Sequence, residues 1–136
     1  MLITCDFDET ICLDEFPMAN TPVPGAIEAI KELNKHHRLI LFTCREGSAL
    51  GLAIQFLKDH NIFHCFETIN EWPEDIQIMW DNNCRKIVGD QNIDDKNAGC
   101  PLVRYEGHYV VDWDMVIGLI CLRELTKHPV CGGIHE

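Results

Sequence analysis

Two aspartates and a threonine stand close together in the segment MLITCDFDET, at the start of the printed sequence. Asp6 and Asp8 are separated by one residue, and Thr10 follows at the same interval. The next basic residue along the chain is Lys31, so no local ion pair neutralises the two carboxylates. Carboxylates gathered at one point repel one another unless a cation binds between them. The segment therefore predicts either an exposed acidic turn or a site that binds something positive.

Two later groups of polar side chains follow apolar runs: Thr43, Cys44 and Arg45 after residues 39–42, and Asp94 and Asp95 after residues 87–93. Short apolar runs without alternation are typical of strands that are covered on both faces of a parallel sheet. In open sheets of this kind, ligands bind at the carboxyl ends of the strands. The three groups therefore predict one site, assembled from residues that are far apart in the sequence.

The elements that must position these groups alternate along the chain. Strands are predicted at residues 1–5, 39–42, 62–69 and 87–93, with a fifth at 101–103. Apolar residues at helical spacing predict helices after the prolines at 22 and 24, from Glu46, over 73–83 and over 112–127. Alternation of this kind implies right-handed crossovers and a parallel sheet. The expected fold class is α/β, with a single Rossmann-like, doubly wound parallel sheet.

Composition narrows the class of protein. A chain of 136 residues is the size of one domain. Its net charge of −11 opposes binding to nucleic acid, because an acidic surface repels phosphate backbones. The longest nearly apolar run, residues 115–122, is far shorter than the roughly 20 residues of a membrane span. No basic segment precedes a secretory-type apolar run, and the eight cysteines form no CxxC pair, so a cytoplasmic protein with inert thiols is expected.

Three other ways of handling phosphate fit the sequence less well. A cysteine-based phosphatase needs Cys-x5-Arg, which none of the cysteines provides. The P-loop pattern GxxxxGK[ST] is absent. A phospho-receiver domain carries its acceptor aspartate at the end of the third strand, where this chain offers Glu67 and Asn70. These comparisons favour an enzyme built around Asp6 and Asp8.

Over about residues 1–100, the motifs resemble those of the haloacid dehalogenase-like (HAD) superfamily of phosphohydrolases. LITC-DFDET-I matches its first motif, a hydrophobic strand followed by DxDx[TV], and LILF with Thr43 matches its second. Lys86 is the candidate for the lysine of the third motif. Asp94-Asp95 matches the acidic pair of the fourth, although Gly89-Asp90 with Asp94 also fits the form GDxxxD. The closest likeness is to small members with TCREG after the second strand.

The resemblance implies a phosphomonoester hydrolase that uses Mg²⁺. Asp6 would attack phosphorus to form an aspartyl phosphate, and Asp8 would protonate the leaving oxygen and then activate water. The metal ligands would be Asp6, the backbone carbonyl of Asp8, and Asp94 or Asp95. Thr10 is expected only to shape the turn.

The implied phosphate-binding residues are Thr43, Cys44, Arg45 and Lys86. The cation among them stays open between Lys86, Arg45 and Lys96. A strand that filled residues 87–93 would place Lys86 at the wrong end of the sheet.

No cap domain is expected, because the intervals between the motifs are already filled by predicted strands and helices. The chain is thus interpreted as a single capless HAD-like domain over residues 1–136, acting on a small phosphorylated metabolite or nucleotide. The alternative is a non-catalytic phosphate- or metal-binding regulatory domain on the same fold.

Three surface features complete the expectations. Glu9, where the superfamily often has glycine, is expected to face outward, with recognition of a cationic part of the substrate as the alternative. Met79 and Trp80 are expected to pack in the core beside Trp72 and Ile76, with an apolar lip beside the substrate as the alternative. A homo-oligomer could form through the last helix, which carries Met115, Leu119 and Leu122 on one side.

Overall fold

A parallel sheet forms the centre of the computed structural model, which describes residues 1–83 and 86–127. Its strands are β1 (Leu2–Cys5), β2 (Arg38–Leu41), β3 (Phe66–Ile69) and β4 (Gln91–Ile93). Their order is β3-β2-β1-β4, and every neighbouring pair is parallel. The chain therefore moves outward from β1 in one direction and then returns to its other side. Such a switch point, here between β1 and β4, is where open α/β sheets bind ligands.

The larger part of the core covers one face of this sheet. The helices α1 (Ala26–Asn34), α2 (Gly47–Asp59) and α4 (Trp113–Lys127) pack apolar side chains against this face, among them Ile30, Phe56 and Trp113. The opposite face carries a smaller cluster of Leu2, Ile40, Trp72 and Ile76, the last from α3 (Glu74–Trp80). The predicted α/β class is confirmed, and its helices cover the two faces unequally.

The strands predicted at residues 1–5 and 39–42 are confirmed to within one residue, whereas the next two are shorter than predicted. A 3-10 turn, Phe63–Cys65, occupies the start of the segment expected to form β3. β4 begins only at Gln91, although the backbone N–H of Asp90 still donates to the carbonyl of Leu2 at 2.7 Å. The Asp90 carboxylate accepts the backbone N–H of Leu2 at 2.9 Å, the donor that an earlier strand residue would otherwise use.

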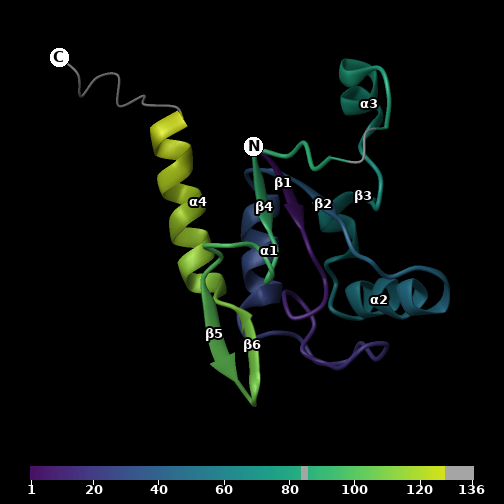
Figure 1. Ribbon diagram of the computed structural model, residues 1–136, viewed down its shortest axis with the longest axis vertical. Helices are drawn as coiled ribbons and strands as arrows, with labels where there is room; N and C mark the ends of the chain where they lie inside the picture. The colour runs from purple at the N-terminus through teal and green to yellow at the C-terminus, as the bar shows by residue number, and fades with distance from the viewer. Residues whose placement is uncertain (84–85, 128–136) are drawn as a thin grey trace.

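The predicted fifth strand exists, but it does not join the parallel sheet. β5 (Leu102–Tyr105) pairs with β6 (His108–Val111) in an antiparallel hairpin of its own. Its two-residue turn is formed by Glu106 and Gly107, both at positive φ (47° and 83°), the geometry that suits a tight hairpin. In Figure 1 this hairpin lies at the end of the molecule opposite the N-terminus. It therefore adds structure beside the loops that follow β1 and β4.

The exposure of apolar side chains was predicted correctly for α4 but not for α3. In α3 only Ile76 is buried, whereas Met79 and Trp80 are 67% and 54% exposed, so their predicted core packing is wrong. The helix ends at Asp81, which adopts a left-handed conformation, and its last turn extends beyond the small cluster. In α4, Met115, Leu119 and Leu122 are exposed as expected. Among the residues that the structure describes, no helix has the length and apolarity to cross a membrane.

Candidate functional site

Three carboxylates meet at the carboxyl end of the sheet. Asp6 follows β1, and Asp94 and Asp95 follow β4, which is paired directly with β1. The backbone N–H of Asp6 donates to the carbonyl of Ile93 at 2.8 Å, so the two strand ends stay in register. One side-chain oxygen from each aspartate lies within 4.8 Å of the others, and each residue is half-buried. The predicted convergence of these residues is confirmed.

The electrostatics of this cluster follow from burial and like charge. Burial first, and then the charge of Asp94, raise the pKa of Asp6 from 3.8 to about 7. Burial also raises the pKa of Asp95 and Asp94 adds to the rise, whereas a hydrogen bond with Asp6 and, to a smaller extent, the charge of Lys96 offset part of it. The cluster thus favours an added positive charge over three free carboxylates. Its donors are all oxygen atoms, which suits a hard cation such as Mg²⁺ better than a thiolate-seeking metal.

Thr10 does more than shape the turn. Its buried hydroxyl donates to the Asp6 carboxylate at 3.1 Å and accepts the backbone N–H of Asp95 at 3.3 Å. The carbonyl of the same residue accepts the indole N–H of Trp113 at 2.7 Å. Thr10 therefore links the two acidic groups and is itself fixed by α4. The DxDxT spacing was the signal for this role. The prediction that Thr10 only shapes the turn was therefore incomplete.

The side chain of Asp8 is not a member of this group of three carboxylates and forms an ion pair with Arg45. The shortest contact, between Arg45 Nη2 and Asp8 Oδ1, is 2.7 Å. The Arg45 guanidinium also donates to the carbonyls of Pro17, Met18 and Ala49, and the residue is only 2% exposed. The sequence predicted that Arg45 binds phosphate. The structure does not support that role, because the N–H donors of Arg45 already bind protein acceptors.

The loop after β2 is shaped by Thr43 together with a residue that the sequence did not single out for the site. The Thr43 hydroxyl accepts the backbone N–H of Arg45 at 3.1 Å, and its own backbone N–H donates to Asn70 Oδ1 at 2.8 Å. The Asn70 amide in turn donates to the carbonyl of Arg45 at 3.3 Å. Cys44 is exposed on this loop. A polar residue directly after β3, at the same edge of the sheet, was the available signal for Asn70.

The two candidate lysines lie in different places. Lys86 is exposed, and residues 86–90 approach β4 from the end of the sheet where the N-terminus lies (Figure 1). The backbone N–H of Asp90 donates to the carbonyl of Leu2 at 2.7 Å, at that same end. The structure thus does not bring Lys86 to the carboxylates. Lys96 follows the acidic pair directly, and its backbone N–H donates to Asp94 Oδ1 at 2.9 Å.

Glu9 was expected to face outward, but its carboxylate is partly buried against the hairpin. Its Oε2 atom is buried without a hydrogen bond, 3.4 Å from Nδ1 of His108 on the hairpin. Burial raises the pKa of Glu9, and the proximity of His108 partly offsets that rise. Glu9 adopts a left-handed conformation with φ of 59°, which glycine would adopt at a lower cost.

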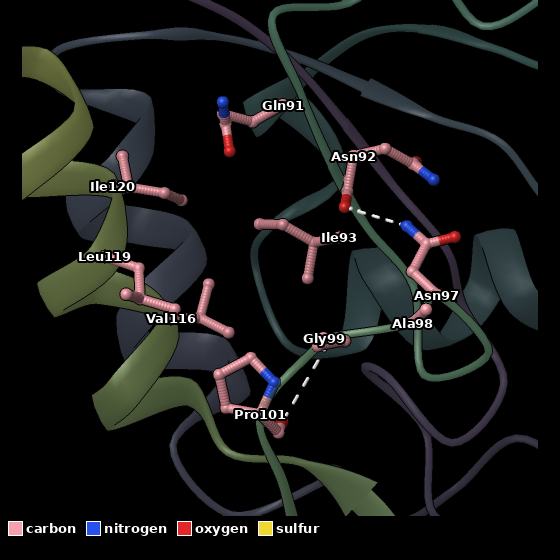
Figure 2. A pocket seen from close by; sticks show the side chains of 11 residues that line it. Gln91, Asn92, Ile93, Asn97, Ala98, Gly99, Pro101, Val116, Leu119 and Ile120 are labelled. Carbon is pink, nitrogen blue, oxygen red and sulfur yellow. Dashed lines mark hydrogen bonds between the residues drawn. The ribbon is translucent and has the colours of Figure 1, made fainter.

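A hollow of about 210 Å³ lies between β4 and α4, next to the loop that follows Asp95 (Figure 2). Side chains from β4, from residues 97–101 and from Val116, Leu119 and Ile120 line it. The Asn97 side chain donates to the carbonyl of Asn92 at 3.0 Å and closes the loop beside it. Asp6, Asp94 and Asp95 are not among the lining residues. The carboxylates therefore lie at the edge of the sheet, outside the lining of this hollow.

Comparison with solved structures gives a match over most of the chain. The matching protein is described as the conserved protein coded by locus from Bacteroides thetaiotaomicron, and it is 32% identical to this chain. The alignment covers 90% of this chain and 91% of that one, with a TM-score of 0.71. The chain belongs to the family of this conserved bacterial protein. No protein-family model matches the chain, and no curated protein matches it. Membership in this family supports the α/β fold, and an activity has to be argued from the site.

Proposed function

We propose that this protein is a Mg²⁺-dependent phosphomonoester hydrolase of the HAD type, which works through an aspartyl phosphate on Asp6. The observation that carries the proposal is the meeting of Asp6, Asp94 and Asp95 at the switch point between β1 and β4. The DFDET motif supplies the first of these carboxylates and, two residues later, a second functional aspartate. Motif and geometry thus support the same chemistry independently.

Asp6 is the nucleophile in this proposal. Its carboxylate oxygen attacks phosphorus, the bond from phosphorus to the leaving oxygen breaks, and water later attacks phosphorus to release inorganic phosphate and restore Asp6. Thr10 fixes the orientation of the carboxylate through the 3.1 Å hydrogen bond. Asp6, Asp94 and Asp95 are the side chains that would hold Mg²⁺, which would offset the negative charge shared by nucleophile and substrate.

Asp8 is the acid–base residue in this proposal, giving a proton to the leaving oxygen and taking one from water. The phosphate oxygens would be bound by Thr43 and by backbone N–H groups at the start of α2, whose first residue is Gly47. Lys96 is the cation that we assign to the phosphate, since it follows the acidic pair directly. The chain approaches β4 from the opposite end of the sheet, where the backbone N–H of Asp90 donates to the carbonyl of Leu2. Lys96 would neutralise charge as the leaving bond breaks.

The proposed substrate is a small phosphorylated metabolite or nucleotide. Between Asp8 and Thr43 the structure has a loop, α1 and β2, which supports a capless architecture with an open site. The hairpin of β5 and β6 lies beside this edge, anchored by the backbone N–H of Val111 donating to the carbonyl of Glu9 at 3.2 Å. Its exposed Tyr105 and Tyr109 offer aromatic surface to a bound molecule.

The test is hydrolysis of p-nitrophenyl phosphate and of a broad panel of phosphate esters, with and without Mg²⁺, by wild type and Asp6→Asn. The proposal expects Mg²⁺-dependent phosphate release that the variant loses. Release that is absent, or equal in the two proteins, contradicts the proposal. The alternative is a non-catalytic metal- or phosphate-binding domain, in which the ion pair between Asp8 and Arg45 would only stabilise the fold. That alternative expects Mg²⁺ to raise the unfolding temperature without any hydrolysis.

A further inference from the structure

We infer that Arg45 is a positioning residue, which orients Asp8 for acid–base chemistry and fixes the loop of residues 14–20 (the entrance loop) without binding substrate. This inference rests on the proposed function and assigns Arg45 a role other than phosphate binding. It is carried by the contacts of the Arg45 side chain, which join three separate segments. These segments are the loop after β1, the entrance loop and the first turn of α2.

Every N–H donor of the guanidinium has an acceptor. Nε donates to Asp8 Oδ2 at 3.0 Å, and Nη2 donates to Asp8 Oδ1 at 2.7 Å and to the carbonyl of Met18 at 3.0 Å. Nη1 donates to the carbonyls of Pro17 at 2.7 Å and Ala49 at 3.1 Å. A guanidinium has five N–H donors in a planar fork, so this set of contacts uses all of them. A phosphate group would therefore have to displace protein acceptors to reach Arg45.

Aromatic rings add to these contacts. The guanidinium carbon lies 4.9 Å from the ring centroid of Phe7 and 5.1 Å from that of Phe16. Phe7 is fully buried next to Asp8, whereas Phe16 is 65% exposed on the entrance loop. Cation–π contacts of this length are attractive, more so where water is excluded. Arg45 thus connects the core beneath the site to the exposed surface beside it.

Arginine suits this position better than lysine. The contacts require a planar, bidentate partner for Asp8 together with three further N–H donors for carbonyls on two segments. An ammonium group has only three donors on a flexible stem and cannot form the bidentate pair. Lysine at this position would keep the charge while leaving Asp8 less restricted and some carbonyls without a donor. Arg45→Lys therefore separates the positioning role from the presence of a positive charge.

The inference predicts a characteristic kinetic pattern. Because Arg45 contacts Asp8 and not the phosphate, Arg45→Lys should lower kcat about 10- to 100-fold, the range typical of residues that orient a reacting group. KM and inhibition by inorganic phosphate should change less than about threefold, since the phosphate-binding groups remain. Direct phosphate binding by Arg45 would instead raise KM and weaken phosphate inhibition together.

A double-mutant cycle makes the test specific. The four proteins are wild type, Arg45→Lys, Asp8→Asn and the double variant, assayed with p-nitrophenyl phosphate. The leaving group of this ester needs little protonation, so the activity that remains without Asp8 can be measured. If Arg45 acts through Asp8, its substitution should lower kcat by less than about threefold in the Asp8→Asn background. An equal loss in both backgrounds overturns the inference.

Arg38→Lys is the matched control, since Arg38 also pairs with two carboxylates, Glu67 and Asp75, but at the opposite end of β2. The kcat of Arg38→Lys should stay within about twofold of wild type.

Circular dichroism tests whether each variant is folded. If Arg45→Lys fails to fold, amide hydrogen exchange in Asp8→Asn provides the decision. Faster exchange at Met18 and Asn20 supports the shared contact set, and unchanged exchange overturns it. A wild type without hydrolysis overturns the proposed function and this inference together, whereas an active wild type with unaffected Arg45→Lys overturns this inference alone.

Discussion

The hydroxyl of Thr10 donates a hydrogen bond of 3.1 Å to the carboxylate of Asp6, and the same oxygen accepts the backbone N–H of Asp95 at 3.3 Å. Two acidic segments that are far apart in the sequence thus share one buried hydroxyl. The contact restricts the orientation of Asp6 and ties the loop after β4 to the loop after β1.

Thr10→Val should remove this connection at nearly constant volume. We expect kcat for p-nitrophenyl phosphate to fall about 10- to 100-fold, as is typical when a group that orients a reacting residue is lost. The backbone N–H of Asp95 would lose its acceptor, which should lower the free energy of unfolding by about 1–3 kcal/mol. Thr10→Ser keeps the hydroxyl and is the control. Urea unfolding and steady-state kinetics measure both effects, and equal kcat values for the two variants would contradict the assigned role.

The carboxylate cluster predicts how stability depends on pH. Burial and then Asp94 raise the pKa of Asp6 from 3.8 to about 7 in the metal-free protein. The folded state therefore binds this proton more tightly than the unfolded state does. Its contribution to stability is present at low pH and is lost as pH rises through about 4 to about 7. Added Mg²⁺ should stabilise the protein more at about pH 8 than at about pH 5, because the carboxylates are then ionised.

Asp94→Asn isolates this effect from other titrating groups. Without the charge of Asp94, the metal-free variant should be more stable than wild type at about pH 8, and the difference should shrink toward about pH 5. Mg²⁺ should reduce the difference, since the variant has lost one ligand. Thermal unfolding at several pH values, with chelator and with Mg²⁺, gives both quantities. A difference that does not depend on pH would show that the three carboxylates are not coupled.

Trp113 supports the site from α4. Its indole N–H donates to the carbonyl of Thr10 at 2.7 Å, and the side chain is fully buried. Trp113→Phe removes that hydrogen bond and leaves a cavity, so we expect the free energy of unfolding to fall by about 2–4 kcal/mol. Trp80→Phe, at an exposed position on α3, should change it by less than about 0.5 kcal/mol. If chemical denaturation gave similar losses for Trp113→Phe and Trp80→Phe, the result would contradict the role of Trp113 in stabilising the site.

The hairpin turn gives a matched pair of glycine substitutions. Gly107 has φ of +83°, so Gly107→Ala should destabilise the protein by about 1–2 kcal/mol. Gly118 lies within α4, and an added Cβ there meets nothing within 4 Å. Gly118→Ala should therefore stabilise the protein by about 0.5–1 kcal/mol. The opposite signs in thermal unfolding are the expected result, and destabilisation by both would contradict the described backbone.

The parts of the site that could be predicted from sequence are those fixed by sheet topology. Asp6, Asp94 and Asp95 each follow an apolar strand, and parallel strands necessarily bring their carboxyl ends to one edge. The hairpin could also have been predicted, because Glu106-Gly107 separates two runs rich in β-branched and aromatic residues. Its antiparallel pairing was missed when residues 101–103 were assigned to the main sheet.

The role of Arg45 could not be predicted in the same way. A residue after a strand at the correct edge fits phosphate binding equally well until the carbonyls of Pro17, Met18 and Ala49 are placed around it. Those acceptors are backbone atoms of an irregular loop and a helix turn, so no side-chain pattern marks them. For Lys86 the sequence did indicate the difficulty, since strand length decides at which end of the sheet a preceding residue lies.

The most direct test of the central claim is detection of the covalent intermediate. Wild type and Asp6→Asn are mixed with p-nitrophenyl phosphate and Mg²⁺, quenched in acid, digested and analysed by mass spectrometry. We predict a phosphorylated aspartate in the wild-type peptide that contains Asp6, and phosphate release at least about a thousandfold slower in Asp6→Asn. Mg²⁺-dependent hydrolysis that continues in Asp6→Asn, or an adduct on another residue, would contradict the claim that Asp6 is the nucleophile.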